Sequence, residues 1–381
     1  MILGIDATNI SSGGGLNHLV SIMANLKISE TAFTSVVIWG SNKTLSALDN
    51  KEWLTRKSPT LLNGNLLART WWKLYYLSNE LNAEGCDVLF VPGGSYTGKF
   101  RPFVTMSRNM LPFEFNEMCR FGFSWMLLKI YLLRAVQIRT FRKASGLIFL
   151  SEYAREKTLE VTGALKAEQK VIPHGINEIF FNPGRVLEEK EKPNLHIIYV
   201  SIIHSYKHQW HVVHAISQLR IKGYLVTIEF VGPAYPPALK MFSRAVEAVD
   251  PEGEFITYRG DVSNNRLPQL YRDADICLFA STCENLPNIL LEGMASGLPV
   301  ASSNKGPMPD ILGDAGVYFD PEKPEQIMKA LEKLILSREL RIKLAKRSQE
   351  IAQHYSWVKA AGKTFAFLDQ MASQSLANKI K

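Results

Sequence analysis

Residues 281–300, STCENLPNILLEGMASGLPV, carry the strongest structural signal in this sequence. They follow an apolar run at 275–280 and lead into another at 299–302, and both runs have the length of buried strands. Between the runs, Pro287 suits the first turn of a helix and Gly297 suits a helix end. The stretch therefore predicts a strand, a helix and a second strand in succession, which is the repeating unit of a parallel α/β sheet.

The same alternation of strand-like and helix-like segments runs along the whole chain. We expect strands at residues 2–7, 35–39, 87–91, 103–106, 146–150, 170–173, 196–203, 225–231, 254–258, 275–280, 299–302 and 317–319. A helix is expected at 207–222, where Trp210, Val213, Ile216 and Leu219 recur at helical spacing. From Pro324 onward the sequence is typical of helices. The pattern predicts the α/β class throughout.

The domain organisation follows from length and from one break in the pattern. A chain of 381 residues exceeds the usual size of one domain, and the segment NEIFFNPGRVLEEKEKPN, 177–194, has the prolines and mixed charges of a linker. We therefore predict two Rossmann-like, doubly wound domains, residues 1–180 and 181–355, with a cleft between them. The last helix, about 356–381, is a candidate to pack back on the first domain.

Composition excludes several classes of protein. Hydrophobic residues make up 46% and charged residues 21%, as in ordinary globular chains. The four cysteines have neither disulfide-framework nor zinc-ligand spacing. The N-terminal MILGIDATNI lacks the basic region of a signal peptide, and no apolar run approaches the roughly 20 residues that span a bilayer. We expect a cytoplasmic protein, and the net charge of +8 favours anionic partners.

Glu284 and Glu292 bracket the start of the helix predicted near Pro287. Free backbone N–H groups from Asn288 onward, and the positive end of the helix dipole, suit a phosphate. A carboxylate on either side accepts hydrogen bonds from hydroxyls, so a diphosphate flanked by two sugars, that is a nucleotide sugar, matches this arrangement. The alternative is that Glu284 caps the helix and Glu292 is solvated.

This pattern resembles the C-terminal domain of family 4 retaining glycosyltransferases, which have the GT-B fold. The resemblance rests on ENLPNILLEGMASGLPVASSNKG (284–306) and GVYFDPEKPEQI (316–327). It extends to YVSIIHSYKHQ (199–209), to VIPHGI (171–176) and to the glycine-rich SSGGGLNHLV (11–20). Motifs in both halves of the chain therefore point to one family.

The resemblance implies roles for individual residues. Glu292 would hold the donor ribose, Glu284 would contact hexose hydroxyls, and Lys207 would neutralise the donor diphosphate, so that Glu284 and Lys207 are the catalytic candidates. The remaining donor-binding candidates are the backbone amides of Asn285 and Leu286 and the loop of Gly13, Gly14 and Gly15. The alternative interpretation of these three glycines is that they form only a flexible turn.

The sequence departs from the family pattern at two places. Ser201, which we include among the donor-binding candidates, stands where the family commonly has an arginine. His204 could replace the positive charge of that arginine if its imidazole is protonated. The family's first-domain histidine is not evident, and TMSRNMLPFEF (105–115) offers Arg108 or Asn109 instead, against an ordinary loop role. His174 is either a ligand contact or a structural loop residue.

No metal site is expected. His208, His211 and His214 follow Lys207 at helical spacing, but no acidic or cysteine partner accompanies them, so a packed or solvated helix face is favoured. The resemblance likewise implies cationic side chains in place of a divalent ion, and we expect no cofactor.

Two aromatic and basic stretches, 68–77 and 121–143, fall in the first domain, where the family binds acceptors. The second stretch is apolar with cations at its flanks, and no acidic residue lies between Glu117 and Glu152. It predicts either an interfacial helix on an anionic membrane or a core helix with a solvated basic face.

The predicted function is retaining transfer of a hexose from a UDP- or GDP-sugar to a saccharide, with a polyprenyl-diphosphate-linked acceptor in bacterial surface-polysaccharide assembly such as O-antigen, capsule or exopolysaccharide. The site would lie in the cytoplasm, with peripheral association at the inner face of the membrane. Rival interpretations are a nucleotide-sugar epimerase, a phosphorylase, which needs a pyridoxal lysine and a longer chain, and a nucleic-acid-binding protein. The last is disfavoured because the cations are interleaved with Leu, Ile and Trp.

Overall fold

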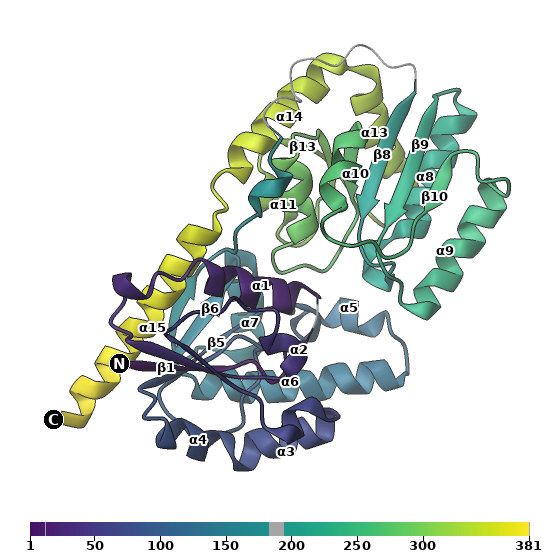
Figure 1. The fold of residues 1–381 in the computed structure, drawn as a ribbon. Helices are drawn as coiled ribbons and strands as arrows, with labels where there is room; N and C mark the ends of the chain where they lie inside the picture. Colours follow the sequence, from purple (N-terminus) through teal and green to yellow (C-terminus); the bar gives the residue numbers. More distant parts are fainter. Residues whose placement is uncertain (12, 183–193, 381) are drawn as a thin grey trace. The chain divides into compact units, whose positions relative to one another are not determined.

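The computed structural model describes residues 1–11, 13–182 and 194–380. The chain divides into two compact units, each with its own parallel sheet (Figure 1). Unit 1 comprises residues 1–115, 123–175 and 356–381, and unit 2 comprises 116–122 and 176–355. The α/β class and the two doubly wound sheets are as the sequence predicts.

The sheet of unit 1 has, among the described residues, seven parallel strands in the order β3-β2-β1-β4-β5-β6-β7. Their bounds are β1 (Ile2–Asp6), β2 (Ser35–Trp39), β3 (Leu54–Lys57), β4 (Val88–Val91), β5 (Phe103–Met106), β6 (Gly146–Phe149) and β7 (Glu168–Val171). Every residue of β4, β5 and β6 is buried, because helices cover both faces of a parallel sheet. The strand order reverses between β1 and β4, which is where such sheets bind ligands.

The helices of unit 1 are α1 (Gly13–Ala24), α2 (Asn42–Leu45), α3 (Leu66–Tyr75), α4 (Leu77–Ala83), α6 (Trp125–Lys143), α7 (Glu152–Thr162) and α15 (Trp357–Ile380). Short 3-10 turns are η1 (Ile28–Glu30), η2 (Thr60–Asn63) and η3 (Leu111–Phe113). The C-terminal α15 packs against α1, β4, β5 and β6. A side chain at Gly175 would lie 2.1 Å from the backbone nitrogen of Trp357, so a glycine is required where the chain passes the start of α15.

The sheet of unit 2 has, within the same described part of the chain, six parallel strands in the order β10-β9-β8-β11-β12-β13. Their bounds are β8 (Leu195–Val200), β9 (Val226–Val231), β10 (Ile256–Tyr258), β11 (Ile276–Phe279), β12 (Val300–Ser303) and β13 (Gly316–Phe319). Here the order reverses between β8 and β11, and the loops that follow these two strands contain Lys207 and Glu284.

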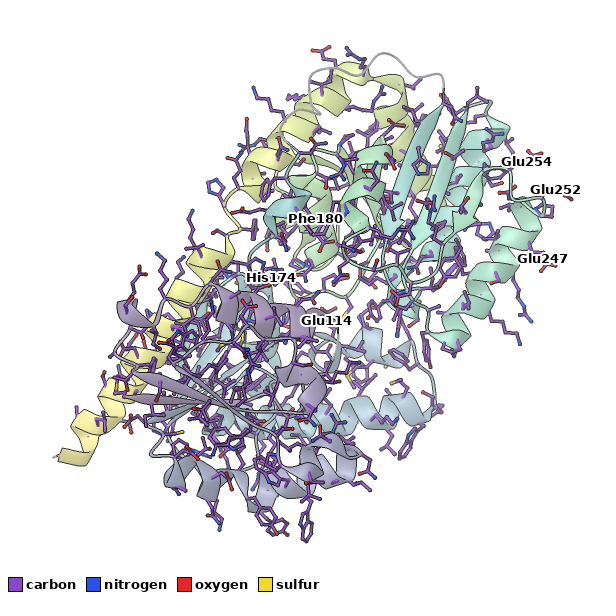
Figure 2. All side chains as sticks on the ribbon, in the orientation of Figure 1. Glu114, His174, Phe180, Glu247, Glu252 and Glu254 are labelled. Carbon is purple, nitrogen blue, oxygen red and sulfur yellow. The ribbon has the colours of Figure 1, made fainter. Side chains whose placement is uncertain are left out.

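The helices of unit 2 are α5 (Phe115–Cys119), α8 (Gln209–Ile221), α9 (Pro236–Val249), α10 (Leu267–Asp273), α11 (Asn288–Ala295), α12 (Met308–Leu312), α13 (Pro324–Leu336) and α14 (Arg338–Ala352), with 3-10 turns η4 (Glu178–Phe180) and η6 (Ser205–Lys207). Helix α9 shows why these helices form: Phe242 and Ala245 are buried, while Glu247 and, after the helix, Glu252 and Glu254 project into solvent (Figure 2).

The structure corrects the sequence analysis in three respects. Strand β3 (LTRK) was not predicted, because an edge strand with two cations and partial exposure shows no apolar run. Residues 116–122 and 176–180 group with unit 2, although the predicted boundary placed all of 1–180 in the first domain. The expected strands at 170–173 and 196–203 end earlier, at Val171 and Val200. Residues 183–193 of the predicted linker lie outside the described residues.

Candidate functional site

The loop from β11 into α11 places the sequence motif at the carboxyl edge of the second sheet. Helix α11 begins at Asn288 after Pro287, which makes no side-chain cap, and ends before Gly297 with φ of +70°. A Cβ at Gly293 would lie 2.5 Å from the Cys277 Sγ, so this glycine lets α11 pack closely on β11. The prediction of a helix opening near Pro287 is confirmed, and its uncapped N-terminus is suited to an anion.

Lys207 and Glu284 form an ion pair beside this helix. Lys207 closes η6, is only 4% exposed, and its Nζ lies 4.9 Å from the centre of the Phe279 ring. The side chain of Glu284 is 14% exposed. The structure therefore brings the two catalytic candidates together, and each neutralises the other in a poorly hydrated place where loss of one partner is costly.

Glu292 lies on α11 and is half-buried. Burial raises the pKa of its carboxyl to about 7. A hydrogen bond from Tyr271 lowers this pKa, but its effect is smaller than that of burial. Asn285 and Leu286, between the two glutamates, are buried in the loop. At neutral pH, Glu292 is thus close to its titration point, whereas Glu284 is held in an ion pair.

Ser201 and His204 do not replace the missing arginine. Ser201 is buried after β8 and its hydroxyl donates to the carbonyl of Ile202 at 3.2 Å. The His204 ring stacks on Tyr235, with centroids 4.9 Å apart. Burial and the charge of Lys207 lower the pKa of His204 to about 4, so the condition under which it would serve as a cation, protonation, is not favoured at neutral pH.

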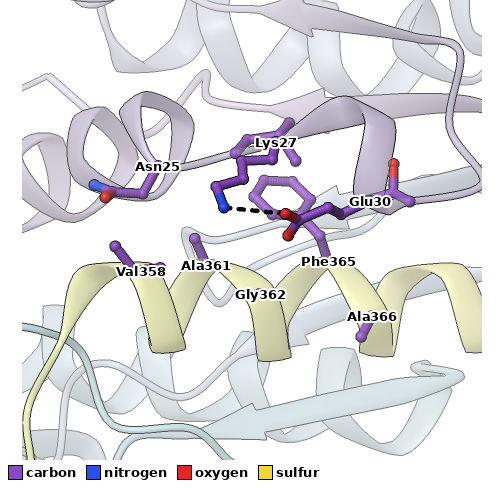
Figure 3. Close-up of a pocket in the computed structure, with 10 residues that line it drawn as sticks. Asn25, Lys27, Glu30, Val358, Ala361, Gly362, Phe365 and Ala366 are labelled. Atoms are coloured by element: carbon purple, nitrogen blue, oxygen red, sulfur yellow. Dashed lines mark hydrogen bonds and ion pairs between the residues drawn. The ribbon is translucent and has the colours of Figure 1, made fainter.

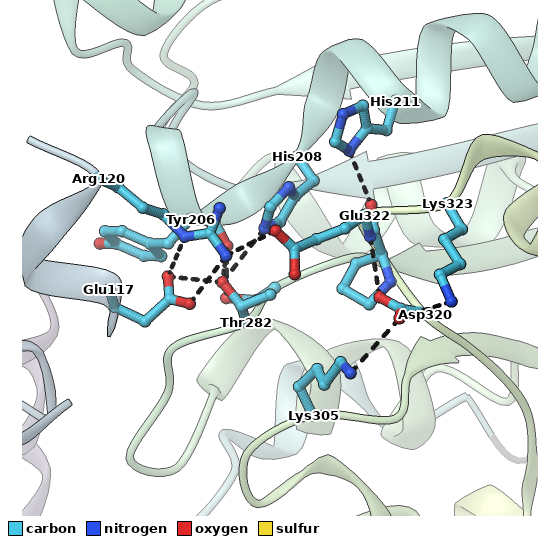
Figure 4. A network of polar contacts seen from close by, with 12 residues as sticks. Glu117, Arg120, Tyr206, His208, His211, Thr282, Lys305, Asp320, Glu322 and Lys323 are labelled. Carbon is cyan, nitrogen blue, oxygen red and sulfur yellow. Dashed lines mark hydrogen bonds and ion pairs between the residues drawn. The ribbon is translucent and has the colours of Figure 1, made fainter. Parts of the chain in front are cut away.

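His208 and His211 are packed side chains. The His208 Nε2 lies 3.2 Å from the Thr282 hydroxyl, and burial lowers the pKa of this residue to about 3. The His211 Nδ1 donates to the carbonyl of Pro321 at 3.0 Å (Figure 4). Among the described residues, no group of three or more His, Cys, Asp or Glu side chains is arranged to hold a metal ion.

A network that the sequence analysis missed fastens residues 116–122 to unit 2 (Figure 4). The Glu117 carboxylate accepts from the Thr282 hydroxyl at 2.7 Å and from two nitrogens of Arg120 at 2.8 and 3.1 Å. Arg120 also pairs with Glu322 at 2.8 Å. Glu117 is 6% exposed, so this is a buried charge satisfied within one connected set.

The same short segment also contacts the loop that carries Lys207. The Phe121 ring lies 5.5 Å from that of His204 and 6.2 Å from that of Tyr235. Thr282, which Glu117 holds, is two residues before Glu284. Residues 116–122 therefore touch both loops of the site. The only sequence signal was the i, i+3 spacing of Glu117 and Arg120, which is common on helix surfaces.

In unit 1, the glycine-rich loop opens α1 at the carboxyl edge of the first sheet. Gly13 has φ of +61°, and a Cβ at Gly15 would lie 3.2 Å from Nη1 of Arg108, so the guanidinium lies against the first turn of α1. Gly14 lies between them in that turn. Asn109 is exposed, and its side-chain oxygen accepts from the backbone N–H of Leu111 at 3.1 Å. Arg108 is therefore beside the glycine loop, and Asn109 shapes its own turn.

His174 belongs to an aromatic cluster in unit 1. Its ring stacks on Trp357 at 5.7 Å between centroids and lies 6.5 Å from the ring of His18, edge-on. It is 5% exposed, and Figure 2 marks its position in the loop after β7. These contacts give it a packing role at the start of α15.

Figure 3 shows a small pocket that is separate from all of these residues. Its wall is formed by the residues that follow α1, by η1 and by α15, with the ion pair of Lys27 and Glu30 at its rim. No candidate site residue lines it. Of its α15 residues, Ala361 and Phe365 are buried packing residues, whereas Val358 and Ala366 are exposed, and we assign the pocket no function.

The aromatic stretches of unit 1 expose much of their apolar surface. On α3 the exposed large side chains are Leu66, Leu67, Trp71, Leu74 and Tyr75. On α6 and just before it they are Phe123, Trp125, Leu128, Tyr131 and Leu132, whereas Gln137 and Phe141 further along are buried. The first half of α6 thus differs from a core helix. In the described part of the chain, no helix is both long enough and apolar enough to cross a bilayer.

Residues 184–351 match the family model for glycosyl transferases group 1. The sulfoquinovosyl transferase SQD2 of Arabidopsis thaliana is 28% identical over 261 residues, which are 64% of this chain and 48% of that protein. The O-antigen chain mannosyltransferase B of Escherichia coli is 31% identical over 103 residues, 27% of each chain. The chain thus spans at most about half the length of these relatives.

Solved structures share the fold of nearly the whole chain. Sucrose-phosphate synthase of Thermosynechococcus elongatus superposes with a TM-score of 0.77 at 14% identity, over 98% of this chain and all of that one. WaaG, a glycosyltransferase involved in lipopolysaccharide biosynthesis, gives a TM-score of 0.68 at 14% identity, over 97% and 99%. The two parallel-sheet units therefore have the GT-B fold, and residues 184–351 are similar to the glycosyl transferases group 1 family.

Proposed function

We propose that this protein is a retaining glycosyltransferase of the family 4 type, which moves a hexose from a nucleoside diphosphate sugar to a saccharide acceptor. The observation that carries the proposal is the buried pair of Lys207 and Glu284 beside the uncapped N-terminus of α11, with Glu292 on the same helix. The family match and the fold of HepE from Anabaena, solved with UDP and with UDP-glucose, support it.

In this proposal the donor diphosphate binds at the first turn of α11. The bond between the anomeric carbon and the diphosphate oxygen breaks, and both bonding electrons leave with the diphosphate. Lys207 and the amides from Asn288 onward stabilise that negative charge, since fixed donors act most strongly in a poorly hydrated site. The acceptor hydroxyl bonds to the anomeric carbon on the face that the diphosphate leaves, and its proton passes to the departing phosphate.

The two glutamates position the substrate on either side of the diphosphate. Glu292 accepts hydrogen bonds from the ribose hydroxyls, and Glu284 accepts from hydroxyls of the hexose. Because Glu284 also pairs with Lys207, binding of the donor exchanges one anionic partner of the ammonium for another. We expect the reaction to need no divalent cation, and full activity after exhaustive treatment with EDTA is the result that agrees with this expectation.

For the acceptor, we propose a saccharide on a polyprenyl diphosphate, as used in bacterial surface-polysaccharide assembly at the cytoplasmic face of the membrane. The exposed apolar side chains of α3 and of the first half of α6 support this, with Lys129 lying over the Trp125 ring at 5.7 Å. A cation beside interfacial aromatic residues suits anionic headgroups. Vesicles with anionic lipid should carry the protein upward on flotation at low salt, and an unbound protein would contradict the membrane assignment.

The proposed activity is tested by incubating the full chain with a panel of UDP- and GDP-sugars. Donors that raise the melting temperature are then supplied with a lipid-linked saccharide, and the product is examined for added hexose and for the configuration at its anomeric carbon. Retention of the donor configuration supports the proposal. Inversion, or isomerisation of the donor without transfer, would contradict it.

A further inference from the structure

Thr282 lies where three segments of unit 2 meet (Figure 4). It belongs to the loop after β11, two residues before Glu284, and is 5% exposed. Its hydroxyl donates to Oε2 of Glu117 at 2.7 Å and lies 3.2 Å from Nε2 of His208. One buried hydroxyl therefore links the loop that carries Glu284 both to the segment 116–122 and to the loop after β8.

The single proton of this hydroxyl determines which nitrogen of His208 carries hydrogen. Thr282 donates that proton to the carboxylate of Glu117, which is an acceptor paired with Arg120, and the carbonyl of Tyr206, 3.3 Å from the hydroxyl, is also only an acceptor. Burial lowers the pKa of His208 to about 3, so its ring is neutral at neutral pH. The contact with Thr282 then requires that Nε2 of the ring carries hydrogen and donates to the hydroxyl oxygen. The hydrogen bonds therefore run in one direction, from His208 through Thr282 to Glu117.

The backbone of His208 is unusual at this contact. Among the described residues other than glycine, His208 alone has a positive φ, +52°, in the left-handed region that a Cβ makes uncommon. It stands at the N-cap of α8 without a side-chain cap, and its buried ring stacks on that of His211 with centroids 5.3 Å apart. Its Nδ1 is buried without a hydrogen-bond partner in the described chain. Proteins retain such backbone conformations and unpartnered groups mainly at functional sites, so this combination indicates a role beyond packing.

We propose that Thr282 and His208 are positioning residues, and that the hydrogen bond between them keeps the two loops of the site aligned when a donor binds. This inference rests on the proposed function, in which the ammonium of Lys207 exchanges Glu284 for the donor diphosphate. In the structure that ion pair joins the two loops directly. Once the pair is exchanged, the loops remain joined at Thr282, by its hydroxyl and by its backbone N–H, which donates to the carbonyl of Tyr206 at 2.9 Å. The hydroxyl should therefore matter more during turnover than in the free protein.

Thr282→Val tests the proposal, because valine has nearly the shape of threonine and lacks the hydroxyl. In the full chain it should lower kcat/KM for the sugar donor about tenfold, the loss expected for a buried hydrogen bond to a charged group. Thr282→Ser restores the hydroxyl and should recover about half of the wild-type value or more. The rise in melting temperature that the donor causes should shrink in Thr282→Val and return in Thr282→Ser, which a role confined to the stability of the free protein does not predict.

Two variants of His208 separate positioning from backbone conformation. Glutamine has its amide nitrogen as many bonds from Cβ as the Nε2 of histidine, so His208→Gln can still donate to Thr282. Asparagine adopts the left-handed conformation more readily than glutamine, but its amide is one bond shorter. His208→Gln should therefore keep a kcat/KM about fivefold or more above that of His208→Asn. A higher value for His208→Asn would show that the backbone conformation matters and the hydrogen bond does not, and would overturn the proposal.

Thr227→Val is the matched control. Thr227, on β9 of the same unit, makes the same kind of contact, with its hydroxyl 3.0 Å from Nδ1 of His196 on β8. Both residues lie near the amino ends of their strands, at the opposite edge of the sheet from the two loops. Thr227→Val should keep kcat/KM within about twofold of the wild type. An equal loss in Thr227→Val and Thr282→Val, or wild-type activity in Thr282→Val, would contradict a positioning role.

Hydrogen exchange of the free protein separates this inference from the proposed function. Without any donor, the backbone amides of residues 203–207 and 283–286 should exchange about threefold faster in Thr282→Val than in the wild type or in Thr282→Ser. If the wild type transfers sugar from none of the donors, the proposed function fails, and the exchange rates still decide whether the hydroxyl orders both loops. Equal exchange in all three proteins would then overturn the inference as well.

Discussion

The strand-to-helix turns at the carboxyl edges of the two sheets differ in how their positive charge is balanced. In unit 2, Lys207 is paired with Glu284, and helix α11, which follows the turn of Glu284, packs through Gly293 against Cys277. In unit 1, Arg69 and Arg108 lie at the turn before α1 without a carboxylate partner among the described residues. Under the proposed function, Lys207 would exchange Glu284 for the donor diphosphate, so the charge of the turn in unit 2 is balanced both with and without ligand.

The largest expected effect is on the turns of unit 2, where Lys207 is paired with Glu284. Lys207→Ala removes the ammonium that stabilises the leaving diphosphate and should lower kcat/KM by about 10²- to 10³-fold, the loss typical of one essential charged donor. Lys222→Ala is the control, because Lys222 forms a surface ion pair with Glu332 at 2.9 Å and should leave turnover unchanged. Steady-state rates near those of the wild type for Lys207→Ala would sink the catalytic assignment.

A methyl group added to the helix that follows each turn should show how differently the two helices are packed. Gly293→Ala would bring a Cβ to 2.5 Å from the buried Cys277 Sγ and should cost about 1 to 3 kcal/mol of stability, as overpacking does. The tightest contact of Gly15→Ala would be the flexible end of Arg108 at 3.2 Å, with Ile10 at an ordinary 3.7 Å, so this change should cost less. Urea unfolding midpoints measure both. A larger loss at Gly15 would mean that Arg108 is held more rigidly than its contacts indicate.

Substitutions in the segment 116–122 should affect the turn of unit 2 that carries Glu284, because this segment contacts Thr282. They should not affect the turn of unit 1 before α1. Arg120→Ala leaves the buried Glu117 carboxylate with Thr282 alone, and the loop that leads to Glu284 loses its support. We expect about a tenfold rise in donor KM, with a smaller change in kcat.

Arg347→Ala is the matched control for Arg120, since Arg347 pairs with Asp314 and Glu350 at 2.8 and 3.3 Å on the surface of the same unit. Arg120→Lys should restore part of the donor affinity. If Arg120→Ala and Arg347→Ala lower the melting temperature equally and neither alters donor KM, the network only stabilises the fold.

The smallest expected effect is a pH dependence specific to Glu292. Burial raises its pKa to about 7, and ribose hydroxyls donate to the ionised form, so nucleotide affinity should increase by up to about tenfold from pH 6 to pH 8. Glu292→Gln should bind more weakly at pH 8 and lose this increase, which separates it from titration of the nucleotide phosphate. The same pH slope in both proteins would show that Glu292 does not contact the ribose.

The fold was predictable because its strands are buried on both faces. Apolar runs such as Val88–Val91 and Ile276–Phe279 are visible in the sequence, whereas the edge strand Leu54–Lys57 is half exposed and carries two cations. The start of α11 was also predictable, because Pro287 and Gly297 are local signals. Local composition therefore located the motif and the sheet around it.

The electrostatics of the site could not be predicted in the same way. The pairing of Lys207 with Glu284 joins residues 77 positions apart, and the contact of Glu117 with Thr282 joins residues 165 apart. The neutral state of His204 depends on burial under Tyr235 and Phe121, which no spacing reveals. Charge compensation is a property of three-dimensional neighbours, and for that reason the contrast between the two turns emerged only from the structure.

The most direct measurement is a crystal structure of the protein with the nucleoside diphosphate that raises its melting temperature most. The account predicts the β-phosphate at the first turn of α11, within hydrogen-bond distance of the Lys207 Nζ, with the Glu284 carboxylate released from that ammonium and Glu292 on the ribose. A nucleotide bound elsewhere, or bound with the ion pair of Lys207 and Glu284 unchanged, would contradict it.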